Sequence, residues 1–194
     1  STLLHWAARH GHMDIIRTLV DREGMNVDST DSKGQTPLFI AARYGHKDEV
    51  VWFLEKGADA SVRDREGMTI LHWAAREGFT SIVELLVTRE EALVTMEDRS
   101  DRTALEWAFL RDNRQAVTIL RRAGAGPLVT DAKGNTLLHW AAERGYEDIA
   151  SLLIGKDADL NARNKAGYVA YHLAANGNHT TIVEMLLDAG AEAD

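Results

Sequence analysis

Histidine is the residue type in this chain best suited to chemistry, because imidazole can serve as a general acid or base near neutral pH and as a metal ligand. The 194 residues include eight histidines and no cysteine. Seven of the histidines fall in two recurring positions: His5, His72, His139 and His172 in one, and His12, His46 and His179 in the other. A side chain that returns at a fixed period is most simply a part of a repeated scaffold. We therefore expect these histidines to hydrogen-bond a nearby threonine or a neighbouring turn.

The sequence patterns that indicate an enzyme or a metal protein are missing. There is no Gly-x-Ser-x-Gly motif, no phosphate-binding loop and no kinase-like set of motifs. No His-x-x-x-His pair is accompanied by a carboxylate in helical register, and zinc–thiolate sites need cysteine. The sequence therefore predicts a non-enzymatic protein with no metal site and no cofactor.

Tryptophan and arginine form a second pattern, which suits binding. The tryptophans recur at one position in four segments, where two other segments carry Ile40 and Leu173; they are Trp6, Trp73, Trp107 and Trp140. Arginines follow three or four residues later, with Tyr44 beside one of them; they are Arg9, Arg43, Arg76, Arg111 and Arg144. Residues at these spacings share a helix face. We call this predicted double row the Trp/Arg trough.

Two interpretations of the Trp/Arg trough stay open. In the first, the tryptophans fill gaps between repeated units and the arginines neutralise neighbouring carboxylates. In the second, the trough binds a partner, since tryptophan and arginine are enriched at interface hot spots. Arginine also binds carboxylate and phosphate groups in a bidentate manner, which favours an acidic or phosphorylated partner. At the turn tips, we expect Met68 and Tyr168 to be exposed contact residues.

A repeated unit must position these side chains. The segment Thr-Ile-Leu-His-Trp-Ala-Ala at residues 69–75 returns in related form at residues 2–8, 36–42, 103–109, 136–142 and 169–175, at spacings of 33 or 34 residues. Such a period indicates one supersecondary unit stacked on copies of itself. The chain is therefore expected to form a solenoid with a long binding surface.

The third copy shows what one unit should be. Residues 64–67 (Asp-Arg-Glu-Gly) form a turn signal, and Thr69 stands where a helix N-cap is expected. A first helix is predicted over Ile70–Glu77, ending at Gly78 in the left-handed C′ position. A second helix is predicted over residues 81–88, where apolar residues recur at helical spacing. In the fourth copy Asp101 and Asp112 replace the usual glycines. We interpret this as drift, which allows a change in stacking between the third and fourth units; the alternative is a local bend or a dedicated contact around residues 99–114.

Residues 31–63, with Asp-x-x-Gly-x-Thr-Pro-Leu, then Gly-His, and later Gly-Ala-Asp, are similar to the ankyrin repeat. The resemblance extends over essentially the whole chain and implies an all-α fold, a curved ankyrin-repeat solenoid of antiparallel helix pairs with hairpin-like turns. It implies a single domain over 1–194, with repeats at about 1–30, 31–63, 64–97, 98–130, 131–163 and 164–194. It also implies a protein-binding scaffold that uses the inner helices and turn tips. Asn161 resembles sites that asparaginyl hydroxylases modify in such repeats.

Composition and charge limit the other function classes. The formal charge of −8 argues against general binding to nucleic acid, which needs a basic surface. No apolar run approaches the ~18 residues of a membrane span, and the start does not resemble a signal peptide. Together with the lack of cysteine, this favours an intracellular, most simply cytoplasmic, location and leaves the nucleus open. We expect a monomer, and both ends look like cut points within a longer polypeptide.

The leading hypothesis is an interaction module that docks a protein segment, acidic or phosphorylated, along the concave face and the turn tips. The residues predicted to bind are Trp6, Arg9, Arg43, Tyr44, Met68, Trp73, Arg76, Trp107, Arg111, Trp140 and Arg144. An alternative is a sensor domain that binds a small anionic ligand in the Trp/Arg trough and regulates an appended effector. A third possibility is an enzyme whose catalytic domain lies outside this sequence.

Overall fold

The computed structural model describes residues 2–126, 130–131, 133–155 and 158–192. Within these ranges every regular element is a helix, apart from one isolated bridge between Glu97 and Thr103. The predicted all-α fold is confirmed.

Each repeat contributes an inner helix, which follows the hairpin turn, and an outer helix, which follows the inner one. The inner helices are α1 (Leu3–Arg9), α3 (Pro37–Arg43), α5 (Ile70–Glu77), α7 (Ala104–Leu110), α9 (Leu137–Arg144) and α11 (Ala170–Asn176). The outer helices are α2 (Met13–Arg17), α4 (Lys47–Glu55), α6 (Thr80–Arg89), α8 (Arg114–Arg122), α10 (Glu147–Ile154) and α12 (Thr180–Asp188). A π-helical turn, η1 (Thr18–Arg22), extends α2, and a 3₁₀ turn, η2 (Glu91–Thr95), follows α6.

The helix ends follow from local chemistry. Helix α5 begins after Thr69, which forms a capping box with His72, and ends at Gly78, whose φ is 77°. These bounds match the prediction, and α6 is one residue longer at each end than predicted. In α3, Pro37 occupies the first turn, where its missing N–H costs nothing, and the Thr36 hydroxyl accepts from the backbone N–H of Phe39.

The core lies between successive helix pairs. In the third repeat Leu71, Ala74 and Ala75 of α5 and Ile82 and Leu86 of α6 are fully buried. The alanines allow the inner helices to approach closely, so that α5 packs against both α3 and α7. Because single helices this short are marginal in water, burial of these faces against the neighbouring repeats is what stabilises each repeat.

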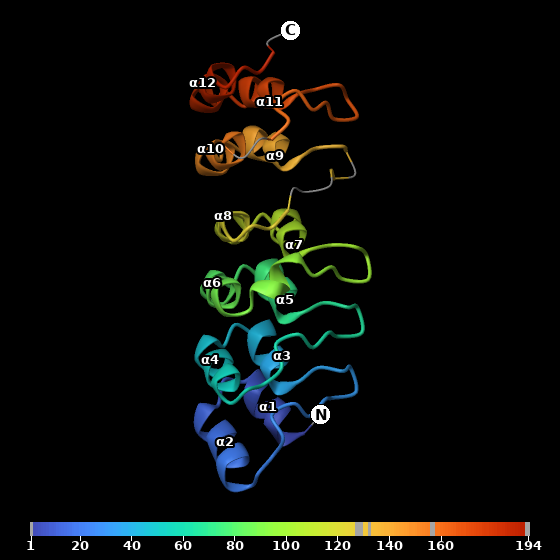
Figure 1. Ribbon diagram of the computed structural model, residues 1–194, viewed down its shortest axis with the longest axis vertical. Helices are drawn as coiled ribbons and strands as arrows, with labels where there is room; N and C mark the ends of the chain where they lie inside the picture. Colours follow the sequence, from blue (N-terminus) through green and yellow to red (C-terminus); the bar gives the residue numbers. More distant parts are fainter. Residues whose placement is uncertain (1, 127–129, 132, 156–157, 193–194) are drawn as a thin grey trace. The chain divides into compact units, whose positions relative to one another are not determined.

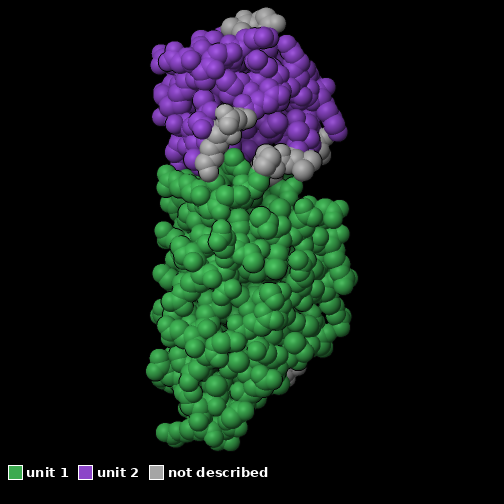
Figure 2. All heavy atoms as spheres, viewed as in Figure 1, with its two compact units in different colours: residues 1–126 green, residues 127–194 purple. Residues whose placement is uncertain are grey.

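The chain divides into two compact units, residues 1–126 and residues 127–194 (Figure 2). In unit 1, four helix pairs stack, and the inner helices lie between the hairpin turns on one side and the outer helices on the other (Figure 1). Unit 2 contains the pairs α9–α10 and α11–α12. The single continuous domain over all six repeats stays a prediction.

The third and fourth repeats pack together inside unit 1. Helix α5 packs on α7, and α6 packs on α8. The two hairpins are also joined, because the Arg99 backbone N–H donates to the Glu66 carbonyl at 3.0 Å. Asp101 and Asp112 adopt φ values of 56° and 61°, so they keep the left-handed conformation of the glycines that they replace. This continuity supports sequence drift, rather than a local bend, in the fourth repeat, and the packing between the third and fourth repeats is unbroken.

None of the helices formed by the described residues has the length and apolar character that crossing a membrane requires.

Candidate functional site

The histidines of the first recurring position link one repeat to the next. In His5, His72 and His139, Nδ1 lies 2.7–2.8 Å from the hydroxyl of the capping threonine and accepts from that residue's backbone N–H. The proton therefore resides on Nε2, which donates to a carbonyl of the following hairpin at 2.9–3.0 Å. Burial lowers the pKa of His72, which favours this neutral form. The predicted scaffold role is confirmed.

The second recurring position holds the repeats together at the ends of the inner helices. Nε2 of His46 bonds the carbonyl of Arg9 at 2.9 Å, and Nε2 of His179 bonds the carbonyl of Glu143 at 3.2 Å. In the fourth repeat Asn113 occupies this position and also bonds the preceding repeat, because its side-chain amide donates to the carbonyls of Ala75 and Arg76 at 2.8 and 2.9 Å. Nowhere in the described part of the chain do three histidine or acidic side chains gather as metal ligands would.

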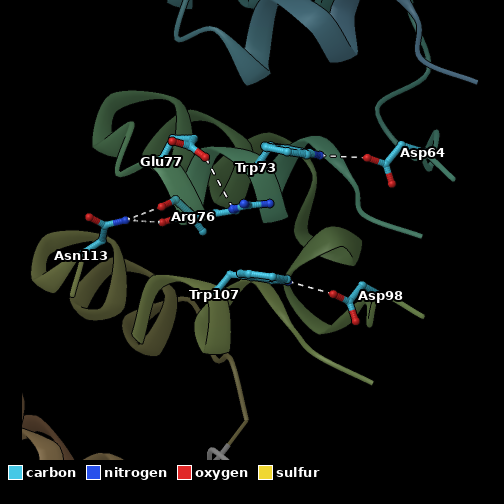
Figure 3. A network of polar contacts seen from close by, with 8 residues as sticks. Asp64, Trp73, Arg76, Glu77, Asp98, Trp107 and Asn113 are labelled. Atoms are coloured by element: carbon cyan, nitrogen blue, oxygen red, sulfur yellow. Dashed lines mark hydrogen bonds and ion pairs between the residues drawn. The ribbon is translucent and has the colours of Figure 1, made fainter. Parts of the chain in front are cut away.

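Two tryptophans are fixed by aspartates of their own hairpins. Nε1 of Trp73 donates to Oδ2 of Asp64 at 3.1 Å, and Nε1 of Trp107 donates to Oδ2 of Asp98 at 2.9 Å (Figure 3). The other oxygen of each aspartate accepts two backbone N–H groups of its turn. This pairing is not among the features expected from the sequence, although each aspartate precedes its tryptophan by nine residues, a spacing that could have indicated it.

Arginine side chains lie on the faces of these two indole rings. The guanidinium carbon of Arg43 is 4.1 Å from the centre of the Trp73 ring, and that of Arg76 is 4.7 Å from the same ring. Arg76 also lies 4.9 Å from the Trp107 ring, so it is placed between the two tryptophans (Figure 3). Arg102 lies 4.8 Å from Trp107. Such cation–π contacts form an alternating stack across three repeats.

The stack continues into the first repeat through a tyrosine. Ile40 occupies the tryptophan position of the second repeat, and Tyr44, one helical turn later, presents its ring instead. Arg9 lies 5.1 Å and Arg43 6.0 Å from the Tyr44 ring centre. We call this set the Arg–aromatic column; its members in unit 1 are Arg9, Tyr44, Arg43, Trp73, Arg76, Trp107 and Arg102. In unit 2, Arg144 lies 5.7 Å from Trp140.

The column differs from the predicted trough in its exposed surface. Trp73 and Trp140 retain 7% and 5% of their accessible surface, because the neighbouring helices bury them and arginines lie on their rings. Trp6 and Tyr44, in contrast, are 49% and 40% exposed. The gap-filling interpretation therefore describes Trp73 and Trp140, whereas Trp6 and Tyr44 present aromatic surface to solvent. Of the arginines predicted to line the trough in unit 1, Arg9, Arg43 and Arg76 lie on rings. Arg76 also has a carboxylate, that of Glu77, 3.6 Å from its Nε.

The expected exposure of Met68 is wrong, and Arg111 lies away from its expected place beside Trp107; the binding role of Arg111 stays a prediction. Met68 is fully buried, not exposed, because backbone hydrogen bonds at both its N–H and its carbonyl tie it to Asp64 and turn its side chain inward. Arg111 lies beyond the end of α7, exposed, and the cation that shares Trp107 with Arg76 is Arg102 from the hairpin. The expected exposure of Tyr168 is confirmed, at 51%.

A groove runs between the hairpins and the inner helices of the second and third repeats. Its volume is about 420 Å³, and its cationic side chains are Lys33, Arg43, Arg65 and Arg76. Its acidic side chains are Asp64, which accepts from Trp73, and Glu66. Nε of Arg76 is buried, and the Glu77 carboxylate lies 3.6 Å from it, beyond hydrogen-bond distance. The groove is thus cationic, with four cationic and two acidic side chains.

A smaller cavity, of about 220 Å³, adjoins this groove on the side of the first repeat. It shares Lys33, Gln35 and Arg43 with the groove and adds Trp6 and Tyr44. The exposed aromatic surface of the Arg–aromatic column is therefore concentrated at this end of unit 1.

Comparison with known proteins identifies what the chain resembles. A family model described as ankyrin repeats (3 copies) matches residues 1–64, 46–131 and 110–194. The chain is 31% identical to palmitoyltransferase AKR1 of Lachancea kluyveri over 96% of its own length, and 32% identical to human Rabankyrin-5 over 83%. It spans only 26% and 14%, respectively, of those two proteins. Among solved structures, an ankyrin repeat domain from Acinetobacter baumannii superposes with a TM-score of 0.79 at 26% identity, covering 97% of this chain and 98% of that one.

Proposed function

This chain belongs to the ankyrin repeat family, whose repeats generally act as protein–protein interaction modules, and we propose that unit 1 binds an extended segment of another protein along its inner helices and hairpin tips. The bound segment carries a carboxylate or phosphoryl group that enters the groove between the second and third repeats. The protein acts as a monomeric scaffold inside the cell, most simply in the cytoplasm.

The observation that carries this proposal is the arrangement of Arg43 and Arg76 around Trp73. A guanidinium group stacked on an aromatic ring keeps its N–H donors in its own plane, where they remain available to an acceptor. Both side chains line the groove. Because the indole holds the guanidinium groups in place, they lose little conformational entropy when they bind an anion.

Charge supports an anionic partner group. The chain as a whole carries −8, whereas the groove contains four cationic side chains and two acidic ones, Asp64 and Glu66. A local positive field within an acidic surface directs an acidic segment to this place and disfavours cationic ones.

The ankyrin repeat fold is typically non-enzymatic, and we propose that these residues catalyse no reaction. One relative is named a palmitoyltransferase, and the chain matches 26% of that protein's length. The support for a non-catalytic role is that five histidines of the two recurring positions are engaged in hydrogen bonds between repeats: His5, His46, His72, His139 and His179.

Peptide-array screening with phosphorylated and acidic peptides, followed by calorimetry on the strongest binder, tests the proposal. Substituting Arg43 and Arg76 together by alanine should weaken binding at least about tenfold, since charged hydrogen bonds contribute ~1.5–3 kcal/mol each, and should flatten its salt dependence. Arg17→Ala combined with Arg89→Ala, on outer helices, is the matched control and should leave binding unchanged. Equal affinity of the Arg43/Arg76 double variant and the wild type would refute the anion-binding groove.

The second candidate, a sensor for a small anionic ligand, is favoured by the groove volume of about 420 Å³, which lies in the range of small-molecule pockets. Thermal shift with nucleotides, inorganic phosphate and dicarboxylates separates the two. A ligand that binds the folded state alone raises its melting temperature. A clear shift with a free ligand, together with no peptide binding, would favour the sensor.

A further inference from the structure

The second repeat lacks a tryptophan at a place that is otherwise built to hold one. In the third repeat Trp73 lies between the arginines of two successive repeats and donates to the hairpin aspartate. In the second repeat the corresponding aspartate is Asp31, and the corresponding arginines are Arg9 and Arg43. Ile40 stands in the tryptophan position and cannot donate a hydrogen bond.

The space beside Ile40 is the cavity of about 220 Å³ that adjoins the groove. The residues that matter to the argument are Trp6, Arg9, Asp31, Ile40, Arg43 and Tyr44, all of which line it. Since a water molecule occupies about 30 Å³ in the liquid, the cavity has room for about seven waters, which is the scale of one large side chain. It is smaller than the pockets that hold drug-sized ligands, which start at about 300 Å³.

The acceptor that an indole would need is available. Oδ1 of Asp31 accepts from the backbone N–H groups of Lys33 and Gln35, at 2.8 and 3.0 Å. No hydrogen bond between described residues uses its Oδ2. In the third and fourth repeats this same oxygen accepts the indole N–H of Trp73 or Trp107. Asp31, which lines the cavity, therefore keeps unused the oxygen that elsewhere holds a tryptophan.

The cavity walls suit a flat aromatic ring. Trp6 and Tyr44, half exposed, bring aromatic surface to it, and Arg9 and Arg43 add guanidinium planes. A cationic side chain is disfavoured, since Arg9, Arg43 and Lys33 outnumber the single carboxylate of Asp31. A neutral aromatic ring with one N–H donor satisfies both the walls and the acceptor.

We propose that this cavity receives the tryptophan side chain of a partner protein, which completes in trans the position that Ile40 leaves open. The indole lies against Ile40, Trp6 and Tyr44, and its N–H donates to Oδ2 of Asp31. This inference rests on the proposed function, because it supplies the apolar anchor of the segment whose anionic group enters the neighbouring groove.

The first experiment uses N-acetyl-tryptophanamide as the probe and follows backbone amide shifts of the ¹⁵N-labelled chain. We expect shifts centred on Asp31, Ile40 and Tyr44 and a dissociation constant on the order of millimolar, as is usual for a single side chain. The 1-methylindole analogue lacks the N–H donor and should bind about tenfold more weakly. The proposal would be overturned if this analogue or N-acetyl-phenylalaninamide bound as well as N-acetyl-tryptophanamide, or if the shifts lay elsewhere on the surface. It would also be overturned if N-acetyl-tyrosinamide bound more tightly, because the occupant would then be tyrosine rather than tryptophan.

Two substitutions test the geometry. Asp31→Asn should fold normally, because Asn164 supports the corresponding turn of the sixth repeat with the same two backbone hydrogen bonds. If the amide nitrogen of the new asparagine faces the cavity, it is a donor and cannot accept the indole N–H; if the amide is flipped, its oxygen is a neutral acceptor and therefore weaker than a carboxylate. In both orientations the probe should bind at least several-fold more weakly. Ile40→Trp should fill the cavity from within and abolish probe binding. Unchanged binding by Asp31→Asn refutes the proposal even if Ile40→Trp does not fold.

The hypothesis that the cavity beside Ile40 binds a tryptophan and the hypothesis that the groove binds an anionic group can be refuted independently. Arg76→Ala lies in the groove and not in the cavity, so it should weaken an acidic or phosphorylated peptide and spare the indole probe. Ile40→Trp should abolish binding of the indole probe and leave binding of the acidic or phosphorylated peptide unchanged. Loss of the indole probe's binding in Arg76→Ala would count against a separate anchor site, whereas loss of peptide binding alone leaves the anchor intact.

Discussion

The second and third repeats of unit 1 are nearly the same structure with one side chain exchanged. Both have a hairpin aspartate that caps its turn, an inner helix with a paired alanine core, and arginines from two successive repeats. In the third repeat Trp73 uses the aspartate and both guanidinium groups, and it is 7% exposed. In the second repeat Ile40 leaves the aspartate oxygen and the adjoining cavity open. The same position is thus filled by the chain's own tryptophan in the third repeat, whereas in the second repeat it is open to a side chain of a partner.

The largest change in stability is expected when the isoleucine of the second repeat replaces the tryptophan at the corresponding position of the third. Trp73→Ile should lower the free energy of unfolding by about 2–4 kcal/mol, because it removes a hydrogen bond to a buried carboxylate and two cation–π contacts. Urea denaturation followed by circular dichroism measures the loss. Trp6→Ile, at a half-exposed position, should cost less than about 1 kcal/mol, and equal losses for the two variants would contradict the distinction between a closed and an open position.

Acid should weaken the joint between the third and fourth repeats. Burial lowers the pKa of His72 in the folded state, so between that value and the ordinary pKa of 6.5 the unfolded chain binds more protons than the folded one. The contribution to stability is therefore complete above about pH 6.5 and is lost as the pH falls below it. Protection factors from hydrogen exchange of α5 and α7 at pH 7 and pH 5 measure it, with His72→Gln as the control, whose protection factors should depend less on pH. Identical protection of the wild type at both pH values would argue against a neutral His72.

Copying the third repeat onto the second should stabilise the protein, by a smaller amount. Ile40→Trp is expected to raise the free energy of unfolding by about 1 kcal/mol if the indole donates to Asp31, and differential scanning calorimetry measures the change. In the Asp31→Asn background the gain should shrink. A gain that is independent of Asp31 would show that the indole packs elsewhere.

The smallest effect is expected at a turn of the fourth repeat. Gly67 has a φ of 78°, and Asp101 holds the corresponding place at 56°. Asp101→Gly should raise the free energy of unfolding by a few tenths of a kcal/mol, or leave it unchanged, because relief of the left-handed strain is offset by greater backbone entropy in the unfolded chain. Gly67→Ala should instead destabilise, since a Cβ there would lie 2.9 Å from the Arg99 backbone nitrogen. Thermal melts of both variants measure the asymmetry, and a destabilising Asp101→Gly would contradict it.

The repeat, its helices and its histidines were predictable because they are local and periodic. The bounds of α5 follow from Thr69 and Gly78, and the role of His72 follows from its return at the same place in other repeats. The common face of Trp73 and Arg76 follows from helical spacing. The site was less predictable. Met68 was expected at the surface because it follows a turn glycine, yet its depth depends on backbone pairing across the hairpin. Arg102 was missed because it approaches Trp107 from a hairpin rather than from the same helix.

The sequence by itself determined the helix pair, its period and which side chains share a face, since these depend on hydrogen bonds and dihedral preferences over a few residues. Only the tertiary structure decided how deeply each tryptophan is buried and which guanidinium lies on which ring. Those outcomes depend on contacts between side chains about thirty residues apart, as between Arg43 and Trp73. Spacing within one helix cannot specify a distance across two repeats, and that distance separates a closed position such as Trp73 from an open one such as Ile40.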